Sequence, residues 1–531
     1  MKKRALFLTV ALLATLTVCL VSLSSCGKGE SEASLEFTSN GDGTCFVSGI
    51  GDCTLEQIII PQISPKGDKV TAIGDKAFFE CFTLKKVTVP NTVTKIGSQA
   101  FRGCIYLTEI EIPQSVRSIG EFALMDCKSL TKISVDINNT SYSGIGNCLI
   151  DIGAKTIVAG CNASQIPNSS AITSIADYAF FDMNQLSIID IGDHITSIGD
   201  HAFDECDSLM AVTVGGALKE IGDYAFAACS DLKTFSFKGE DALESIGDFA
   251  FQACDSLSAF YFPSTLKTVG QGAFWSCDSF KKANAASISS WAQIEFESTS
   301  ATPLNYGSLY FNSEIVTDLV IPSDVERIGS HAFYSASDIV SITFSDSVTS
   351  IGDYAFASCS SLEVLKLGES VKSIGKHAFA DCTALKSASF PAATESIGEY
   401  ALFGCSALNK ITVAEENKKY SSSGNCLTDV ENKTLIVGCN SSTFPTDIEI
   451  TAIANYAFSK RTGLTKIAIP NSVSSIGFQA FGGCIALTEV TVESTSGWSA
   501  YKSLQDNDGE TVDLTVANLK DTYSNYYWKQ K

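Results

Sequence analysis

Cysteine is the residue type that offers most chemistry in this chain, which has nineteen cysteines among 531 residues. Thiols form disulfides, ligate zinc and act as nucleophiles. No two cysteines stand at the C-x-x-C spacing typical of zinc and redox sites, so the sequence predicts neither. Eleven of them recur in the context A-F-x-x-C or a close variant, at Cys81, Cys104, Cys127, Cys206, Cys229, Cys254, Cys277, Cys359, Cys382, Cys405 and Cys484.

These recurring cysteines allow two interpretations. If successive segments stack as strands about 4.7–4.9 Å apart, their sulfurs come within disulfide reach. Each cysteine, however, lies among Phe, Leu and Ile residues, and a free cysteine packs as a small apolar residue. We therefore predict a ladder of buried, reduced thiols.

Two further pairs lie in similar segments, Cys148 with Cys161 and Cys426 with Cys439. Each segment has the pattern of a β-hairpin, and a turn about its midpoint would place the two sulfurs opposite each other across the strands. We predict a disulfide in each hairpin. A third candidate pair is Cys45 with Cys53.

Other catalytic or metal-binding patterns are absent from the sequence. There is no H-E-x-x-H, no G-x-S-x-G and no phosphate-binding glycine loop, so we expect no enzyme, no metal and no cofactor. Three of the four histidines share the position before Ala-Phe with aromatic residues, which indicates a structural role. An acidic row follows the repeated glycine, and helix N-capping explains it without calcium. The histidines are His201, His331 and His377, and the acidic residues are Asp75, Asp200, Asp223, Asp248 and Asp353.

The elements that position these residues come from an internal repeat. The pattern I-G-x-x-A-F-x-x-C-x-x-L-x-x-I-x-I-P recurs fourteen times, mostly every 23 residues, and such a period is typical of a solenoid. We predict a strand ending at Ile-Gly, one or two helical turns over A-F-x-x-C, and a strand over L-x-x-I-x-I. The predicted fold is an α+β repeat solenoid with short parallel strands stacked into one long sheet, short helical turns and inserted β-hairpins.

A second symmetry lies over the short repeat. A block of about 130 residues, hairpin included, recurs with an offset of 278 residues. From these patterns we predict a polar tether at 26–40, a capping hairpin at 41–69 and repeats at 70–280. An irregular spacer at 281–320, repeats at 321–492 and a C-terminal cap or tail at 493–531 follow. The tail is rich in aromatic residues, and a ligand platform is the alternative to a cap.

The N-terminus has the features of an export signal. Lys2, Lys3 and Arg4 precede an apolar run that ends at Leu23-Ser24-Ser25-Cys26, which resembles the lipobox of bacterial lipoproteins. The resemblance implies a signal peptide at 1–25, lipid attachment at Cys26 and an extracytoplasmic, lipid-anchored protein, in the outer membrane of a diderm cell. An uncleaved anchor is the alternative, since the run is barely long enough to span a membrane. The net charge of −22 argues against nucleic acid, so the lipid anchor is the only membrane contact that we expect.

The repeat, the Asn-Cys-Leu hairpins and the Ser-Trp to Leu-Tyr spacer at 290–310 resemble the leucine-rich-repeat family named after the BspA surface protein. The resemblance covers about 70–495. It implies a right-handed solenoid and adhesion to host proteins or other cells, without catalytic residues. The chain departs from the pattern at Leu124, Ala176, Leu402 and Ala454, and at Ser335-Ala336. All of these changes are compatible with core packing.

The surface left for a ligand is the outward face of the L-x-x-I-x-I strand, where alternate side chains point to solvent. We predict a large, shallow face for an extracellular or host protein or a glycan, and a monomer. The alternative is a structural repeat protein of the envelope without a specific host ligand. The candidate ligand residues are Lys86, Thr88, Glu109, Glu111, Lys132, Tyr261 and Lys366.

Overall fold

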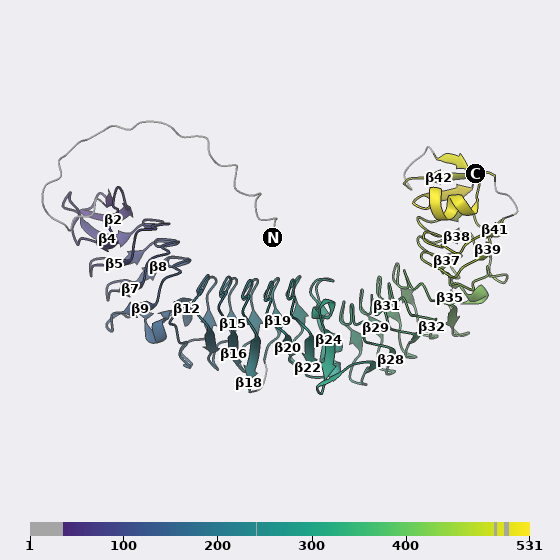
Figure 1. The fold of residues 1–531 in the computed structure, drawn as a ribbon, viewed down its shortest axis with the longest axis horizontal. Coiled ribbons are helices and arrows are strands. Elements are labelled where there is room, and N and C mark those ends of the chain that lie inside the picture. The colour runs from purple at the N-terminus through teal and green to yellow at the C-terminus, as the bar shows by residue number, and fades with distance from the viewer. Residues whose placement is uncertain (1–34, 240–241, 493–495, 504–508, 531) are drawn as a thin grey trace.

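The computed structural model describes residues 35–239, 242–492, 496–503 and 509–530. The chain winds into coils that stack side by side along an arc, and both ends of the arc turn toward the same side (Figure 1). Each regular coil carries two short strands, one at L-x-x-I-x-I and one at Ile-Gly. The predicted solenoid of stacked parallel strands is confirmed.

The strands form two parallel ladders instead of one long sheet. Figure 1 shows the L-x-x-I-x-I strands along the convex edge of the arc, here called the outer ladder, and the Ile-Gly strands nearer its concave edge, here called the inner ladder. Both ladders are divided, because inserted segments interrupt the stacking. The outer ladder comprises β3 (Gln57–Ile59), β5 (Lys86–Thr88), β7 (Glu109–Ile112), β9 (Lys132–Val135), β14 (Ile188–Ile191), β16 (Ala211–Gly215), β18 (Thr234–Lys238), β20 (Ala259–Phe262), β22 (Lys282–Ala285), β24 (Ser308–Phe311), β26 (Asp318–Val320), β28 (Ser341–Thr343), β30 (Val364–Lys366), β32 (Ser387–Phe390), β34 (Lys410–Val413), β39 (Lys466–Ala468) and β41 (Glu489–Thr491).

The inner ladder consists mostly of two-residue strands, because a turn begins directly after the last residue of each strand, in most coils at a glycine. It comprises β4 (Lys69–Ile73), β6 (Lys95–Ile96), β8 (Ser118–Ile119), β13 (Ser174–Ile175), β15 (Ser197–Ile198), β17 (Glu220–Ile221), β19 (Ser245–Ile246), β21 (Thr268–Val269), β23 (Glu295–Phe296), β27 (Arg327–Ile328), β29 (Ser350–Ile351), β31 (Ser373–Ile374), β33 (Ser396–Ile397), β38 (Ala452–Ile453) and β40 (Ser475–Ile476).

The third side of each coil, over A-F-x-x-C, is not helical as predicted. The residues before Ala-Phe and before Cys have positive φ, as at Tyr224 (55°) and Ala228 (54°), while a helix needs negative φ throughout. This alternation turns every second N–H toward the next coil. Tyr224, Phe226 and Ala228 donate to carbonyl oxygens 2.7–2.8 Å away in that coil. The segment is a hydrogen-bonded ladder between coils.

The acidic row therefore does not cap helices. The Oδ1 atom of Asp200 accepts the backbone N–H of Asp223 in the following coil at 2.8 Å, and Asp223 accepts that of Asp248 at 2.7 Å. Each carboxylate satisfies a donor of its neighbour and ties two coils together. No group of His, Cys, Asp and Glu within the described ranges could hold a metal ion.

The core is built from stacked phenylalanines and thiols. Phe203 and Phe226 lie parallel with ring centroids 5.1 Å apart, and the Sγ atom of Cys229 lies 3.2 Å from the carbonyl oxygen of Phe203, to which it donates. The same thiol-to-carbonyl contact recurs from coil to coil, which explains a cysteine where a purely apolar residue would fill the space. All seventeen cysteines in the described residues are buried free thiols.

Two hairpins interrupt the inner ladder, as expected from the broken period. In the first, β10 (Tyr142–Ser143), η1 (Ile145–Asn147) and β11 (Leu149–Asp151) precede β12 (Thr156–Ala159), which pairs in parallel with β13. In the second, β35 (Tyr420–Ser421), η3 (Ser423–Asn425) and β36 (Leu427–Asp429) precede β37 (Thr434–Val437), which pairs with β38. The two insertions are the same structure used twice.

The spacer is irregular in sequence but continues both ladders. Strands β22, β23 and β24 pair in parallel with the strands of the coils before them. Between them lie α1 (Ile288–Gln293) and η2 (Pro303–Asn305), and β25 (Glu314–Ile315) folds back on β24. At the N-terminus β1 (Glu36–Ser39) pairs with β2 (Thr44–Gly49), so the described end of the segment predicted as a tether, 26–40, forms a strand.

The C-terminal segment closes the solenoid. Strands β42 (Trp498–Tyr501), β43 (Glu510–Val512) and β44 (Tyr527–Gln530) form an antiparallel sheet with η4 (Asn518–Thr522) beside it, and β44 pairs with β40. Trp498 and Trp528 are buried in its core, which excludes these two rings from a ligand platform. Within the part of the chain that the structure describes, no helix has the length and apolar character needed to cross a membrane.

Candidate binding surfaces

Five of the seven predicted ligand residues lie together on the outer ladder near the N-terminal end. Strand register places Lys86 beside Glu109 and Glu109 beside Lys132. Glu109 forms an ion pair with Lys86, and one of its oxygens lies 3.7 Å from the Nζ atom of Lys132. The hydrogen bond from Lys86 is the main cause that lowers the pKa of Glu109. The outward row therefore alternates in charge.

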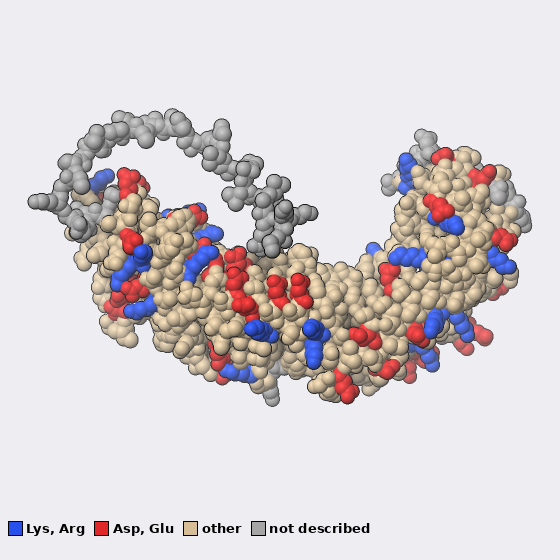
Figure 2. Space-filling model, viewed as in Figure 1, with Lys and Arg blue, Asp and Glu red and all other residues tan. Residues whose placement is uncertain are grey.

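Thr88 and Glu111 complete this cluster. Together with the lysines, Asn91 and Asp136 they line a hollow of about 300 Å³ over β5, β7 and β9. Figure 2 shows acidic and basic side chains close together at this end of the arc, and further groups of charged side chains over its middle and near its other end. We refer to this cluster as the N-terminal charged face, defined by Lys86, Thr88, Glu109, Glu111 and Lys132.

The other two predicted residues are not part of this face. Tyr261 lies on β20 and Lys366 on β30, several coils away. Both are exposed, and the ring of Tyr261 lies 6.0 Å from that of Phe237. The structure thus places all seven on the outer ladder but brings only five together.

The position before Ala-Phe forms a row of stacked rings at the surface. His201 lies between Tyr178 and Tyr224 with ring centroids 4.6 and 4.7 Å away, and His377 stacks on Tyr354 at 4.6 Å. Burial lowers the pKa of His331 and of His377. These ring contacts give the three histidines a structural role, in which they stack with the aromatic residues at the same position of neighbouring coils.

The hairpin cysteines are not joined. A β-bulge shifts the register, so that Leu149 pairs with Ala159 while Ile150 pairs with Ile157. Cys148 would face Cys161 only if Leu149 paired with Gly160, so the observed register leaves the two cysteines offset, and their side chains pack into different core clusters. Cys426 and Cys439 likewise pack into two different core clusters. All four are buried free thiols, as are Cys45 and Cys53, so the structure does not support the expected disulfides.

Beneath each hairpin the inner ladder opens into a pocket. The first, of about 290 Å³, lies between β8 and β12 and is lined by residues that include Ile119, Leu124, Val158 and Ala176. The second, of about 180 Å³, lies between β33 and β37 and is lined by residues that include Ile397, Leu402, Ile436 and Ala454. These residues correspond pairwise with the 278-residue offset.

A tyrosine takes over the hydrogen bond that a strand would make at each opening. The backbone N–H of Ile119 donates to the Oη atom of Tyr142 at 2.8 Å, and that of Ile397 donates to Tyr420 Oη at 3.1 Å. Burial is the main cause that raises the pKa of both tyrosines. The tyrosine hydroxyl thus accepts the N–H that a neighbouring strand would otherwise bind at each break in the ladder.

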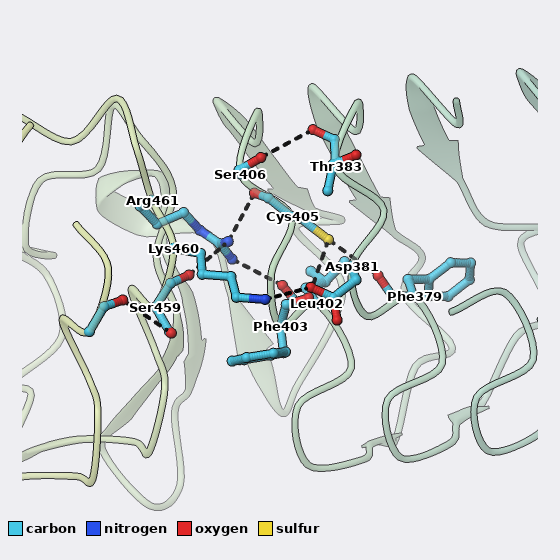
Figure 3. Close-up of polar contacts among 11 residues, drawn as sticks. Phe379, Asp381, Thr383, Leu402, Phe403, Cys405, Ser406, Ser459, Lys460 and Arg461 are labelled. Carbon is cyan, nitrogen blue, oxygen red and sulfur yellow. Dashed lines mark hydrogen bonds and ion pairs between the residues drawn. The ribbon is translucent and has the colours of Figure 1, made fainter. Parts of the chain in front are cut away.

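The second pocket contains a buried arginine that the sequence analysis did not identify. Arg461 is 1% exposed and occupies the cysteine position of its coil, where the first block has Met183. Figure 3 shows its guanidinium reaching the preceding coil, where it donates to the carbonyl oxygens of Cys405 at 2.9 Å and Leu402 at 3.1 Å. The sequence does contain a signal for this residue, because Arg461 is the one charged residue at a repeat position that is apolar in the other coils.

Two more carbonyl oxygens accept from this side chain. The Nε atom donates to Gly438 at 2.7 Å and Nη1 to Ser459 at 3.4 Å. Burial lowers the pKa of Arg461. The neighbouring Lys460 pairs with Asp381 at 3.0 Å and lies 4.8 Å from the centre of the Phe403 ring (Figure 3). The lysine charge is thus neutralised, whereas the arginine charge meets only backbone dipoles.

A family model for the BspA type leucine-rich repeat region matches most of the chain, at residues 50–150, 151–281, 305–432, 429–507 and 451–526. The chain belongs to the BspA-type leucine-rich-repeat family. No curated protein sequence matches it. A leucine-rich repeat protein from Bacteroides ovatus is 26% identical with a TM-score of 0.50, over 72% of this chain and 94% of that one.

Other solved leucine-rich-repeat structures resemble this BspA-type chain less closely. A leucine rich cell surface protein from Faecalibacterium prausnitzii is 22% identical with a TM-score of 0.31, over 89% of this chain and 96% of that one. The pneumococcal vaccine antigen PcpA is 18% identical with a TM-score of 0.35, over 61% and 63% of the two chains.

Proposed function

We propose that this protein is a non-catalytic, lipid-anchored component of the bacterial cell surface that binds extracellular or host proteins through its outer ladder. The observation that supports the proposal most is the N-terminal charged face, where Lys86, Glu109 and Lys132 alternate in charge on neighbouring strands. Such a face suits a large partner with complementary charge better than a small molecule. Adhesion is also what the BspA-type family resemblance implies.

The charged face is tested by reversing two charges. Lys86→Glu combined with Lys132→Glu leaves five adjacent acidic or polar side chains and should weaken binding to a captured extracellular protein at least tenfold, mainly through a slower association. Biolayer interferometry of the chain against immobilised extracellular matrix proteins measures the change. Lys95→Glu is the matched control, because Lys95 is an exposed lysine of the inner ladder in the same region.

Equal loss in the Lys95→Glu variant would assign the effect to net charge and contradict the outer ladder as the binding surface. An intact chain that binds none of a broad set of extracellular proteins would favour the scaffold alternative.

The anchor rests on Cys26, which lies outside the described residues. Cys26→Ser should abolish incorporation of a labelled fatty acid into the chain and leave an unprocessed precursor, because the thiol is the acyl acceptor in the resembled lipobox. Cys19→Ser is the matched control, since Cys19 lies within the apolar run and should keep full labelling. Labelling retained in the Cys26→Ser variant refutes the anchor.

A further inference from the structure

The two hairpin pockets are built alike but carry different charges. Of the residues that line the first pocket, Glu121 and Asp177 are acidic and none is basic. At the corresponding positions the second pocket has Glu399 and Asn455, and it adds Arg461. The second copy of the block has therefore replaced one carboxylate by an amide and gained a cation in the same cavity.

The cation at the second pocket has no anionic partner among the described residues that contact it. All four hydrogen bonds of Arg461 go to backbone carbonyl oxygens. Asp381, the nearby carboxylate of the preceding coils, pairs with Lys460 instead. A buried cation that lacks a counter-ion costs free energy, and an anion that enters its site recovers part of it.

Apart from Arg461, Glu399 and Asn455, the pocket is lined mostly by apolar and aromatic side chains. Tyr400 and Tyr456 meet edge to face with centroids 5.0 Å apart, and Phe403 meets Tyr456 in the same way at 5.2 Å. Ile397 and Val437 complete the wall. A volume of about 180 Å³ is smaller than the roughly 300–1,000 Å³ of pockets that hold drug-sized ligands, so only a small ligand fits.

We propose that the pocket between β33 and β37 binds a small organic monocarboxylate, with its carboxylate directed at Arg461 and its apolar body between the aromatic walls. Nη2 of Arg461 donates one hydrogen bond, to Leu402. In the proposed complex its second N–H donates to the ligand carboxylate. Asn455, whose Oδ1 accepts the N–H of Phe478 at 2.9 Å, adds an amide at the rim without a negative charge. This site lies on the inner ladder and is independent of the charged face of the outer ladder.

The first pocket acts as an internal control for this proposal. It has the larger volume and the same hairpin, but Met183 replaces the arginine and Asp177 adds a negative charge at its rim. An anion is disfavoured there, so the proposal predicts a single site in each chain.

Benzoate is a suitable probe, and benzamide is its uncharged analogue of nearly equal shape. Equilibrium dialysis of the intact chain with labelled benzoate should show saturable binding of one molecule for each chain, and benzamide should compete at least tenfold less well. Ala454→Leu enlarges an apolar side chain of the pocket wall, leaves Arg461 itself in place and should weaken binding at least tenfold. Ala176→Leu makes the same change in the first pocket and should leave binding unchanged.

Arg461→Met introduces the side chain of the first block and should also abolish binding. Thermal unfolding of each variant shows whether it is folded. If Arg461→Met does not fold, the binding measured for Ala454→Leu tests the proposal in its place. The proposal is overturned if benzoate shows no saturable binding, if benzamide competes equally, or if folded Ala454→Leu binds as well as the parent chain.

Discussion

Gly247→Ala should destabilise the solenoid by about 3 kcal/mol, although it adds only one methyl group. A Cβ atom at Gly247 would lie 2.7 Å from the backbone nitrogen of Asp223 and 2.7 Å from the carbonyl carbon of Gly222. These atoms belong to the preceding coil, which Gly247 holds through a hydrogen bond of 2.8 Å to Ile221. The methyl group fits only if the two coils move apart, and the hydrogen bonds between them then lengthen together.

The urea midpoint of unfolding, followed by circular dichroism, measures this effect. Ala454→Gly is the matched control, because Ala454 occupies the glycine position of a coil that follows a hairpin and lines the open pocket. Its cost should be about 0.5–1 kcal/mol, the ordinary difference between alanine and glycine. If Gly247→Ala proves as mild as Ala454→Gly, close contact between coils is not the reason for the repeated glycine.

The regular coils can be predicted from the sequence, whereas the pockets between them cannot. The period of the repeat is sufficient to predict stacked coils, the core role of Phe and Cys, and the outward side chains of the outer ladder, because each depends on one coil and its identical neighbour. The pockets depend on which coils do not stack. Leu124, Ala176, Leu402 and Ala454 were visible as departures from the repeat, and each of them lines a pocket.

Those departures have a common physical cause. Where a hairpin replaces the neighbouring coil, its strand (β12 or β37) continues past the point at which a regular coil turns, and alanine occupies the glycine position beside it. The hairpin glycines carry the close contact instead, since a Cβ at Gly160 or Gly438 would lie 1.9 Å from the ring of Phe180 or Phe458. Arg461 belongs to the same set, because it donates to carbonyl oxygens of a coil that lies more than fifty residues earlier in sequence.

Two wrong predictions also arose from relations between coils. A-F-x-x-C was expected to form helical turns, but its N–H groups find acceptors in the next coil, which a single unit does not reveal. The hairpin disulfides were inferred from a turn at the midpoint of each cysteine pair, but the observed turn lies closer to the first cysteine and the bulge makes up only part of the offset. The sequence pattern of one repeat predicts that a coil forms, whereas the hydrogen bonds between coils determine the backbone conformation within it.

Raising the pH above 9 should destabilise the solenoid steeply, because its core contains many buried thiols. Burial raises the pKa of Cys104, Cys277 and Cys359 to about 12 from an ordinary value of 9.0. The folded chain keeps these protons between pH 9 and 12, whereas the unfolded chain releases them. Stability therefore falls as pH rises, by about 1.4 kcal/mol per pH unit for each thiol, and is unaffected by these groups well below pH 9.

The slope is measured from urea midpoints between pH 7 and 10. Removing two thiols in the double variant Cys277→Ala and Cys359→Ala should make the slope shallower by about 1.4 kcal/mol per pH unit at pH 9, approaching about 2.8 kcal/mol per pH unit towards pH 10, whatever its effect at pH 7. Buried tyrosines such as Tyr142 and Tyr420, whose pKa values burial also raises, act above pH 10 and remain in both chains. A slope that the double variant leaves unchanged would show that ionisation of the thiols does not drive the alkaline transition. Such a result would point to a core in which these cysteines are already oxidised or are exposed to solvent before unfolding.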